Sequence, residues 1–205
     1  MAEITENVIG NINTIENETE VGLQSSSSPF CQTFYFEDYY DDKAVKAFIK
    51  SVEKLIRTSI EYKTYIEELR TSVFELNRDV VLHNITNADT SLEFHHYPLN
   101  LYEIVETCIL HHVVNNEKFT SFSLAKEIMD LHFKHKIGIV PLSKTNHELA
   151  HSGNLFISKH QIFGNYEKFI EEYGDGLSID IKNNLALLDK YTEDNVPIDF
   201  KGLFK

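Results

Sequence analysis

The sequence predicts an α+β fold that is mostly helical, and three observations lead to this expectation. Apolar residues recur at three- and four-residue spacings through residues 42–70, as on one face of a long helix. The stretch 90–97 instead alternates apolar and polar side chains, which is typical of a half-buried β-strand. A short run with β-branched residues at 136–142 adds a second strand, and helical spacings fill most of the remaining chain.

The N-terminal third combines a tail with a long helix. Residues 1–32 are acidic and Asn-rich and contain a serine run, so we expect a flexible tail. The aromatic, acidic segment Phe34–Asp42 either packs onto the domain or docks a protein partner. The helix expected at 42–70 carries one apolar stripe, which is more often core than a dimer seam. Its members are Val45, Phe48, Val52, Leu55, Ser59, Tyr62, Ile66 and Leu69.

The middle of the chain is expected to hold the two strands, with two helices between them. The segment 74–86 is ambiguous and could form a short helix and then a strand. The alternation at 90–97 places Glu93 and His95 on one face, and Phe94 and His96 on the other. Helical spacings follow within 99–114, where Cys108 falls on the buried face, and again at about 123–132.

A short helix follows the second strand, and further helices follow it. Ser143 or Thr145 is expected to begin the short helix, with Thr145 and Glu148 in the spacing of a capping box. Gly153 is expected to end it. The segments 164–174 and 179–191 have the periodicity of C-terminal helices.

Composition excludes several classes of protein. The net charge of −13 argues against a general nucleic-acid binder, which is usually basic. Lysines nevertheless outnumber acids between Lys118 and Lys168, which is either mild support for an anionic ligand or ordinary scatter. Cys31 and Cys108 are isolated, so neither a cysteine zinc site nor a disulfide framework is indicated, and a reducing, cytosolic setting is expected. No signal peptide or apolar run of membrane-spanning length is recognisable.

The short helix contains the sequence HELAH, which fits the H-E-x-x-H pattern. On a helix this spacing places His147 and His151 one turn apart on the same face. In metalloproteases the pattern binds zinc, and the glutamate, here Glu148, acts as general base. The extended form of the motif would need Gly at 154 and His at 157, where this chain has Asn154 and Ile157. A protease with a downstream Glu ligand, Glu167 or Glu171, is therefore kept only as a remote alternative.

A second histidine pair lies upstream, in EFHHYP at residues 93–98. A strand ending in His-His, a second strand, and a short helix with His at i and i+4 together resemble the HNH endonucleases, the ββα-metal nucleases. The blocks EFHHYP and VPLSKTNHELAHSG are most similar to HNH proteins encoded by bacteriophages. The resemblance covers roughly residues 45–173. It implies a ββα-metal core that carries a two-helix insertion between its strands.

The resemblance and the residues together suggest roles for the candidate site. His95, His147 and His151 would hold one divalent ion, and His96 would be the catalytic base; from the residues alone the roles of His95 and His96 could be exchanged. Imidazole ligands favour bound zinc, while Mg, Mn or Ni could support activity.

Two further residues have open roles. Glu93 is either an outer acceptor for a ligand imidazole or a solvated strand residue. Lys144 is either a phosphate contact at the helix N-terminus or simply exposed to solvent.

Two departures from the family pattern stand out. Colicin-type members carry Asn nine residues before the first helix histidine, where this chain has Gly138. A two-helix insertion also separates the strands, which is tolerable because the cost of loop closure grows slowly with length.

We therefore expect a flexible tail at 1–32 and one HNH-like domain at 33–205. Its parts would be an N-terminal helical part (33–82), the ββα-metal core with its insertion (83–154) and C-terminal helices (155–205).

The leading hypothesis is a metal-dependent DNA endonuclease in the host cytoplasm. The alternative is a non-catalytic, zinc-stapled binding or assembly protein of a phage, which Gly138, the acidic charge and Phe34–Asp42 favour. The chain has ten histidines, so chance pairs such as His111 and His112 are expected.

Overall fold

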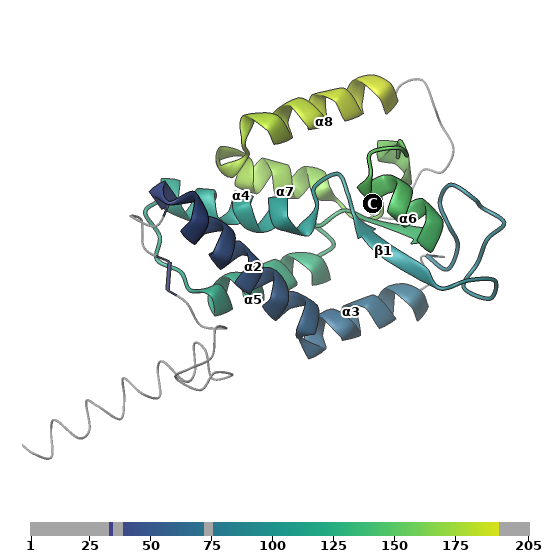
Figure 1. The fold of residues 1–205 in the computed structure, drawn as a ribbon, viewed down its shortest axis with the longest axis horizontal. Coiled ribbons are helices and arrows are strands. Elements are labelled where there is room, and N and C mark those ends of the chain that lie inside the picture. The colour runs from purple at the N-terminus through teal and green to yellow at the C-terminus, as the bar shows by residue number, and fades with distance from the viewer. Residues whose placement is uncertain (1–32, 35–38, 72–75, 193–205) are drawn as a thin grey trace, which may run out of the picture.

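The computed structural model describes residues 33–34, 39–71 and 76–192 (Figure 1). The expected tail at 1–32 and residues 35–38 of the segment Phe34–Asp42 lie outside the described residues. In chain order the elements are α2 (Asp42–Thr58), α3 (Ile60–Thr71), β1 (Leu92–His96), α4 (Leu101–Val114), α5 (Ser121–Phe133), β2 (Ile139–Ser143), α6 (Lys144–His151), α7 (Tyr166–Tyr173) and α8 (Ile179–Thr192), with 3-10 turns at Lys159–Gln161 and Gly174–Gly176. The described chain is thus α+β and mostly helical, as the sequence predicts.

The single long helix expected at 42–70 is wrong, because the chain breaks at Ser59. This residue has an extended backbone (φ −66°, ψ 154°) between α2 and α3. Its hydroxyl is 2.8 Å from the Ile56 carbonyl and accepts a hydrogen bond from the Tyr62 amide at 3.0 Å, so it both ends α2 and caps α3. Ser59 keeps the three- and four-residue spacing of the stripe, which is why the periodicity does not reveal the break.

The two strands form a two-stranded antiparallel sheet in which His95 lies opposite Val140 and His96 opposite Ile139. The inserted helices α4 and α5 lie between the strands in sequence. Helix α6 begins directly after β2 and packs on both strands. The segment 76–91 holds turns and an isolated bridge between Arg78 and Thr86, not the short helix and strand considered for it.

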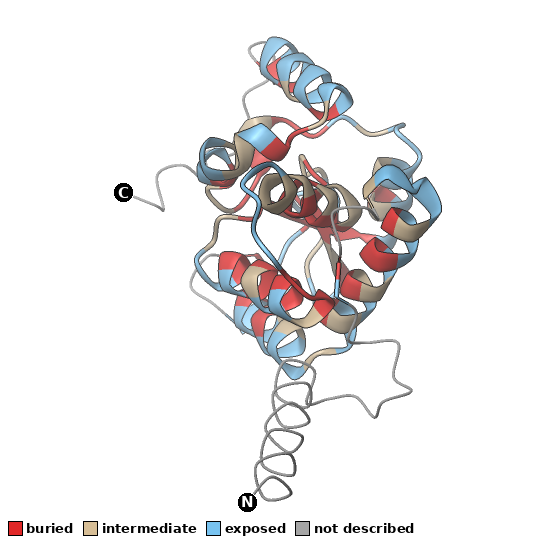
Figure 2. Cartoon of the chain, turned by 90° about the vertical axis from the view of Figure 1, so that its left-hand side faces the viewer, coloured by how far each residue is buried: buried red, intermediate tan, exposed pale blue. Residues whose placement is uncertain are grey.

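The hydrophobic core lies between the helices and the sheet, and buried residues gather on their inward faces (Figure 2). Helix α2 packs on α4 and α5, and Cys108 on α4 is fully buried, as expected for a small apolar residue. Phe34 is also buried: its ring lies 4.9 Å from that of Phe48 and 5.3 Å from that of Phe119. At Phe34, therefore, the Phe34–Asp42 segment packs onto the core.

Helix α6 is as short as the sequence predicts, and of the two expected starts, Ser143 and Thr145, the structure has the first. Its N-cap is Ser143, which makes no side-chain capping bond, and the helix begins at Lys144. The capping box predicted for Thr145 and Glu148 is therefore wrong, because Thr145 already lies inside the helix. Gly153 ends the helix as expected: it has a positive φ of 71°, and its amide donates to the Ala150 carbonyl at 3.1 Å.

Candidate metal centre and adjoining cavity

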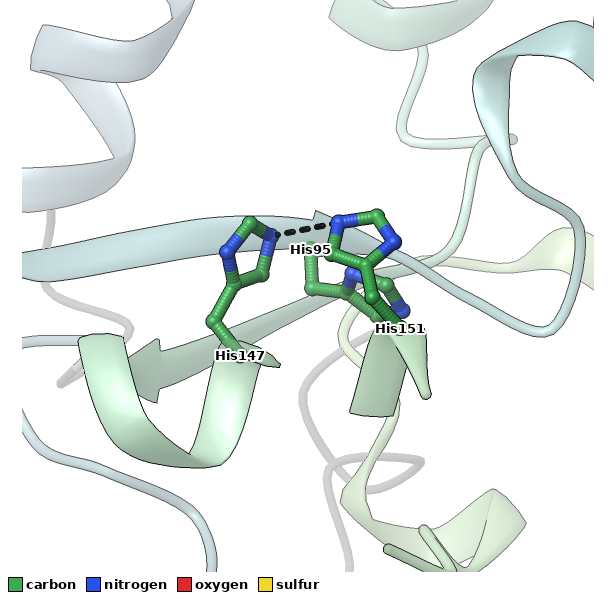
Figure 3. Close-up of side chains that lie close together, drawn as sticks. All are labelled: His95, His147 and His151. Atoms are coloured by element: carbon green, nitrogen blue, oxygen red, sulfur yellow. Dashed lines mark hydrogen bonds between the residues drawn. The ribbon is translucent and has the colours of Figure 1, made fainter. Parts of the chain in front are cut away.

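Three histidines converge where β1 meets α6 (Figure 3). His95 is supplied by the strand, and His147 and His151 by successive turns of the helix. One ring nitrogen from each lies within 4.8 Å of the others, and the Nε2 atoms of His147 and His151 are 3.2 Å apart. The antiparallel pairing places the start of β1, at Leu92, opposite the end of β2, at Ser143. Helix α6 follows Ser143 and packs on both strands, which brings its two histidines to His95.

The spacing of these nitrogens suits a small transition-metal ion. Zinc–nitrogen bonds of about 2.0–2.1 Å at tetrahedral angles place two ligand nitrogens roughly 3.3 Å apart. The His147–His151 distance already matches this value, and the His95 nitrogen lies within 4.8 Å of the other two. Three protein ligands on a four-coordinate ion leave one position for water or substrate.

The protonation states also suit metal binding. Burial, followed by the nearby rings of His151 and His147, lowers the pKa of His95 to about 4. Burial also lowers the pKa of His147, although the Glu93 carboxylate partly opposes this. Both rings are therefore neutral near pH 7, and the neutral imidazole is the form that binds metals.

Glu93 lies beside the cluster and contacts one of its rings. Its Oε2 is 2.5 Å from Nδ1 of His147. A carboxylate that accepts a hydrogen bond from Nδ1–H fixes the tautomer and leaves the Nε2 lone pair free for an ion. Nε2 is also the atom that faces His151. Glu93 thus contacts a ring of the cluster, while 43% of its side chain is exposed to solvent.

His96 does not join this cluster. It points to the opposite face of β1, as the alternation predicts, and only 6% of the residue is exposed. Its Nε2 is 2.9 Å from Nε2 of His132 on α5, and its ring lies parallel to that of Tyr62. Burial, and after it the neighbouring His132, hold the pKa of His96 well below its usual value, so the ring is neutral.

A cavity of about 300 Å³ adjoins the histidines and connects the two faces. His95, His96, His147 and His151 all line it. So do Arg57 at the end of α2 and Arg70 at the end of α3, and both arginines are exposed. Two cations therefore border the cluster in a chain whose net charge is −13.

The two other residues singled out in α6 lie away from this cavity. Lys144, the first residue of the helix, and Glu148 are both exposed. Among the described residues, neither lines the cavity and neither belongs to the histidine cluster. The cluster takes its third histidine from upstream, at β1, whereas the metalloprotease alternative needs a ligand from downstream.

The buried carboxylate of Asp79 connects the loop at residues 79–82 to the start of α6. One oxygen accepts from the amides of Val81 and Leu82 at 2.7 and 2.8 Å. The other accepts from the Ser143 amide at 2.6 Å and from the Asn146 side chain at 2.8 Å. Burial alone would raise the pKa of Asp79, but hydrogen bonds from Ser143, Leu82 and Val81 outweigh it and hold the pKa below its usual value.

The backbone around Gly138 leaves no room for a side chain. A Cβ atom at Gly138 would lie 2.0 Å from the Tyr97 carbonyl oxygen, so no side chain fits there. The Gly138 carbonyl accepts a hydrogen bond from the Tyr97 amide at 3.0 Å, which keeps the two chain segments close.

Comparison with known proteins gives one match, to the model of the Bacteriophage G278-like virion protein family, over residues 1–200. The chain belongs to this family. The searches of curated proteins and of solved structures returned no match. Membership of the G278-like virion family supports the bacteriophage origin that the sequence predicts, but the family description names no nuclease.

The family description also bears on location. It refers to the virion, whereas the sequence led us to expect the host cytoplasm, so the cytoplasm stays a prediction. Within the described residues of this G278-like protein, no helix is both long enough and apolar enough to cross a membrane.

Sequence reasoning missed four residues around the centre: Arg57, Arg70, His132 and Asp79. The arginines have no signal in the sequence, because helical spacing marks the buried face and not what borders a cavity. His132 does have a signal in the sequence, since it lies one turn after Ile128 on the inner face of α5. The signal for Asp79 is weaker: Asp often accepts hydrogen bonds from amides two or three residues ahead in a turn.

Proposed function

We propose that this virion-family protein is a metal-dependent DNA endonuclease of the HNH, or ββα-metal, type. One observation carries the proposal: three histidines in ligand-like positions on a strand and a helix face a cavity bordered by two arginines. Structural zinc sites are almost always closed by four protein ligands, whereas catalytic ones keep a position open. Among the described residues the cluster has three members.

In this proposal His95, His147 and His151 hold one divalent ion, most readily zinc, with Mg, Mn or Ni as alternatives for activity. The bound ion would polarise a non-bridging phosphate oxygen and stabilise the leaving 3′ oxygen. Glu93 orients His147 and raises its basicity as a ligand.

His96 is the proposed general base. A water molecule in the cavity loses a proton to His96, and its oxygen then bonds to phosphorus while the P–O3′ bond breaks. The 3′ oxygen takes a proton from solvent, so the products are a 5′-phosphate and a 3′-hydroxyl. Neutral His96 is the form that can accept this proton, and its ring lines the same cavity as the three ligands.

Arg57 and Arg70 are the proposed phosphate contacts. Guanidinium groups bind phosphate through paired N–H donors, and both lie on the cavity wall. Such a local pair of cations would give an acidic protein a place where a polyanion can bind. Lys144 is exposed outside this wall, so it is the less direct candidate.

A plasmid-nicking assay tests the proposal with the full chain, first stripped by chelator and then supplied with Zn, Mn, Mg or Ni. We expect supercoiled plasmid to become open-circular or linear with at least one metal. His147→Ala and His96→Ala should abolish cleavage, while Glu148→Gln, an exposed change on the same helix, should retain it. Cleavage that survives His96→Ala, or loss of a proteolytic activity in Glu148→Gln, would contradict the proposed roles.

The second candidate is a non-catalytic assembly protein in which the metal only staples β1 to α6. Membership of a virion protein family and the acidic net charge favour it. The same assay separates the two, because a scaffold would bind one metal per chain and cleave no DNA with any of the four ions. In that case His147→Ala would lower the thermal midpoint of the metal-loaded protein without any nuclease activity to lose.

A further inference from the structure

Two buried histidines meet behind the candidate centre. The Nε2 atoms of His96 on β1 and His132 on α5 are 2.9 Å apart. His132 is fully buried. A polar pair this deep in a core is costly unless its hydrogen bonds are satisfied, so the direction of the shared proton matters.

A backbone carbonyl fixes that direction. Nδ1 of His132 is 2.7 Å from the carbonyl oxygen of Ile128, which can only accept a hydrogen bond, so Nδ1 carries the proton. Burial lowers the pKa of His132 to about 4, so the ring is neutral and its Nε2 has a lone pair. The nitrogen facing it, Nε2 of His96, must therefore be the donor.

We infer that His132 is a positioning residue that holds His96 in the Nε2–H tautomer and so presents the Nδ1 lone pair of His96 to the cavity. The inference rests on the proposed function, in which His96 is the base. His96 lines the cavity while its Nε2 faces the core, so Nδ1 is the nitrogen left to accept a proton from water.

Aromatic neighbours fix the planes of both rings. Tyr62 lies parallel to His96, with an angle of 11° between the rings and 6.2 Å between their centroids. Tyr65 meets the His132 ring edge-on at 5.2 Å, and Tyr62 does so at 5.8 Å. A flip of either ring would break the chain of hydrogen bonds from Ile128 to His96, leaving a buried donor or acceptor without a partner.

The arrangement also gives the inserted helices a function. His132 belongs to α5, which lies in sequence between the two strands of the site. The insertion thus places one residue directly behind the proposed base. His132→Leu removes the acceptor while leaving an apolar side chain in the core, and His132→Gln restores an acceptor through its amide oxygen.

The experiment compares wild type with His132→Leu and His132→Gln. The nicking assay gives kcat and KM, a separate titration gives the Co²⁺ affinity, and thermal melting checks that each variant is folded. A lost tautomer should lower kcat about 10²-fold or more in His132→Leu, because general-base catalysis contributes that much. KM and Co²⁺ affinity should stay within about twofold, since neither depends on the tautomer of His96. His132→Gln should recover most of kcat.

Nitrogen-15 NMR of the full wild-type chain tests the inference apart from activity. We expect the His96 resonances of an Nε2–H tautomer, with Nδ1 unprotonated, even if no metal supports cleavage. An Nδ1–H tautomer in wild type would overturn the inference, as would unchanged kcat in a folded His132→Leu. Absence of cleavage by wild type would refute the proposed function, and the NMR result would then decide the tautomer alone.

Discussion

Asp79 provides a test of how the candidate centre is held in place. Its carboxylate accepts four hydrogen bonds and joins the loop at 79–82 to the junction between β2 and α6. Of the four donors, the Ser143 amide and the Asn146 side chain belong to buried residues, whereas Leu82 is exposed and Val81 half-buried. Truncation to alanine therefore leaves two donors that water does not readily reach.

The magnitude follows from those two donors. A buried donor without an acceptor costs about 1–3 kcal/mol, so Asp79→Ala should lower the free energy of unfolding by about 2–6 kcal/mol. That is a large fraction of the roughly 5–15 kcal/mol that a whole domain has. Asp79→Asn keeps one carbonyl oxygen but turns an NH₂ group towards two donors, so it should recover only part of the loss.

Urea unfolding of the full chain measures this loss, with Asp89→Ala as the matched control. Asp89 also accepts two hydrogen bonds within a turn, both from Thr86, but it is exposed, so water can replace it. We expect a much smaller shift of the midpoint for Asp89→Ala. Equal midpoints for wild type and Asp79→Ala would refute the idea that this carboxylate holds the loop to α6.

The same residue predicts a pH dependence. Because the pKa of Asp79 in the folded protein is lower than in the unfolded chain, its contribution to stability is present above the unfolded value of about 3.9. The contribution is lost as the pH falls through the lower, folded value. Below about pH 4, therefore, wild type should lose stability more steeply than Asp79→Asn.

Three further predictions concern other positions. Glu93→Gln should weaken Zn²⁺ affinity about 10–100-fold in a chelator competition, because it removes the carboxylate that orients His147; unchanged affinity would make Glu93 a surface residue. Gly138→Asn should lower the free energy of unfolding by about 1–3 kcal/mol or more and leave nicking no faster, because a Cβ there meets the Tyr97 carbonyl; a melting midpoint equal to that of wild type would show that the backbone can yield. Cys108 should resist a thiol reagent in the native state, because burial raises its pKa and blocks access; labelling of Cys108 without urea, mapped by mass spectrometry, would contradict its burial.

The sequence predicted the elements whose signals are local. The periodicity of α4, α5, α7 and α8, the alternation of β1 and the glycine that ends α6 each depend on neighbours within one or two turns. The break at Ser59 escaped because a serine can keep the helical spacing while its hydroxyl caps a new helix. The sequence left the start of α6 open between Ser143 and Thr145, and only the capping box at Thr145 was wrong, since the letters of a capping box do not say which residue leaves the helical conformation first.

The site divides in the same way. The H-x-x-x-H spacing indicated that His147 and His151 share a face, and the alternation of the strand separated His95 from His96. The residues alone left open which of these two joins the helix pair, and in the structure it is His95. The partners that complete the surroundings, His132 behind His96 and the arginines on the cavity wall, come from elements that meet only in three dimensions. A periodic pattern tells which face of a helix is buried, but not what that face is buried against.

The position of α4 and α5 between the two strands affects the order of events while the chain is being synthesised. His95 leaves the ribosome well before His147 and His151, and the helices that follow it can form from local contacts alone. The strand that carries His95 gains its partner only when β2 has emerged. A nascent chain that stops before α6 therefore holds only one of the three histidines, and uptake of a metal ion by all three would report that this part of the chain is complete and folded.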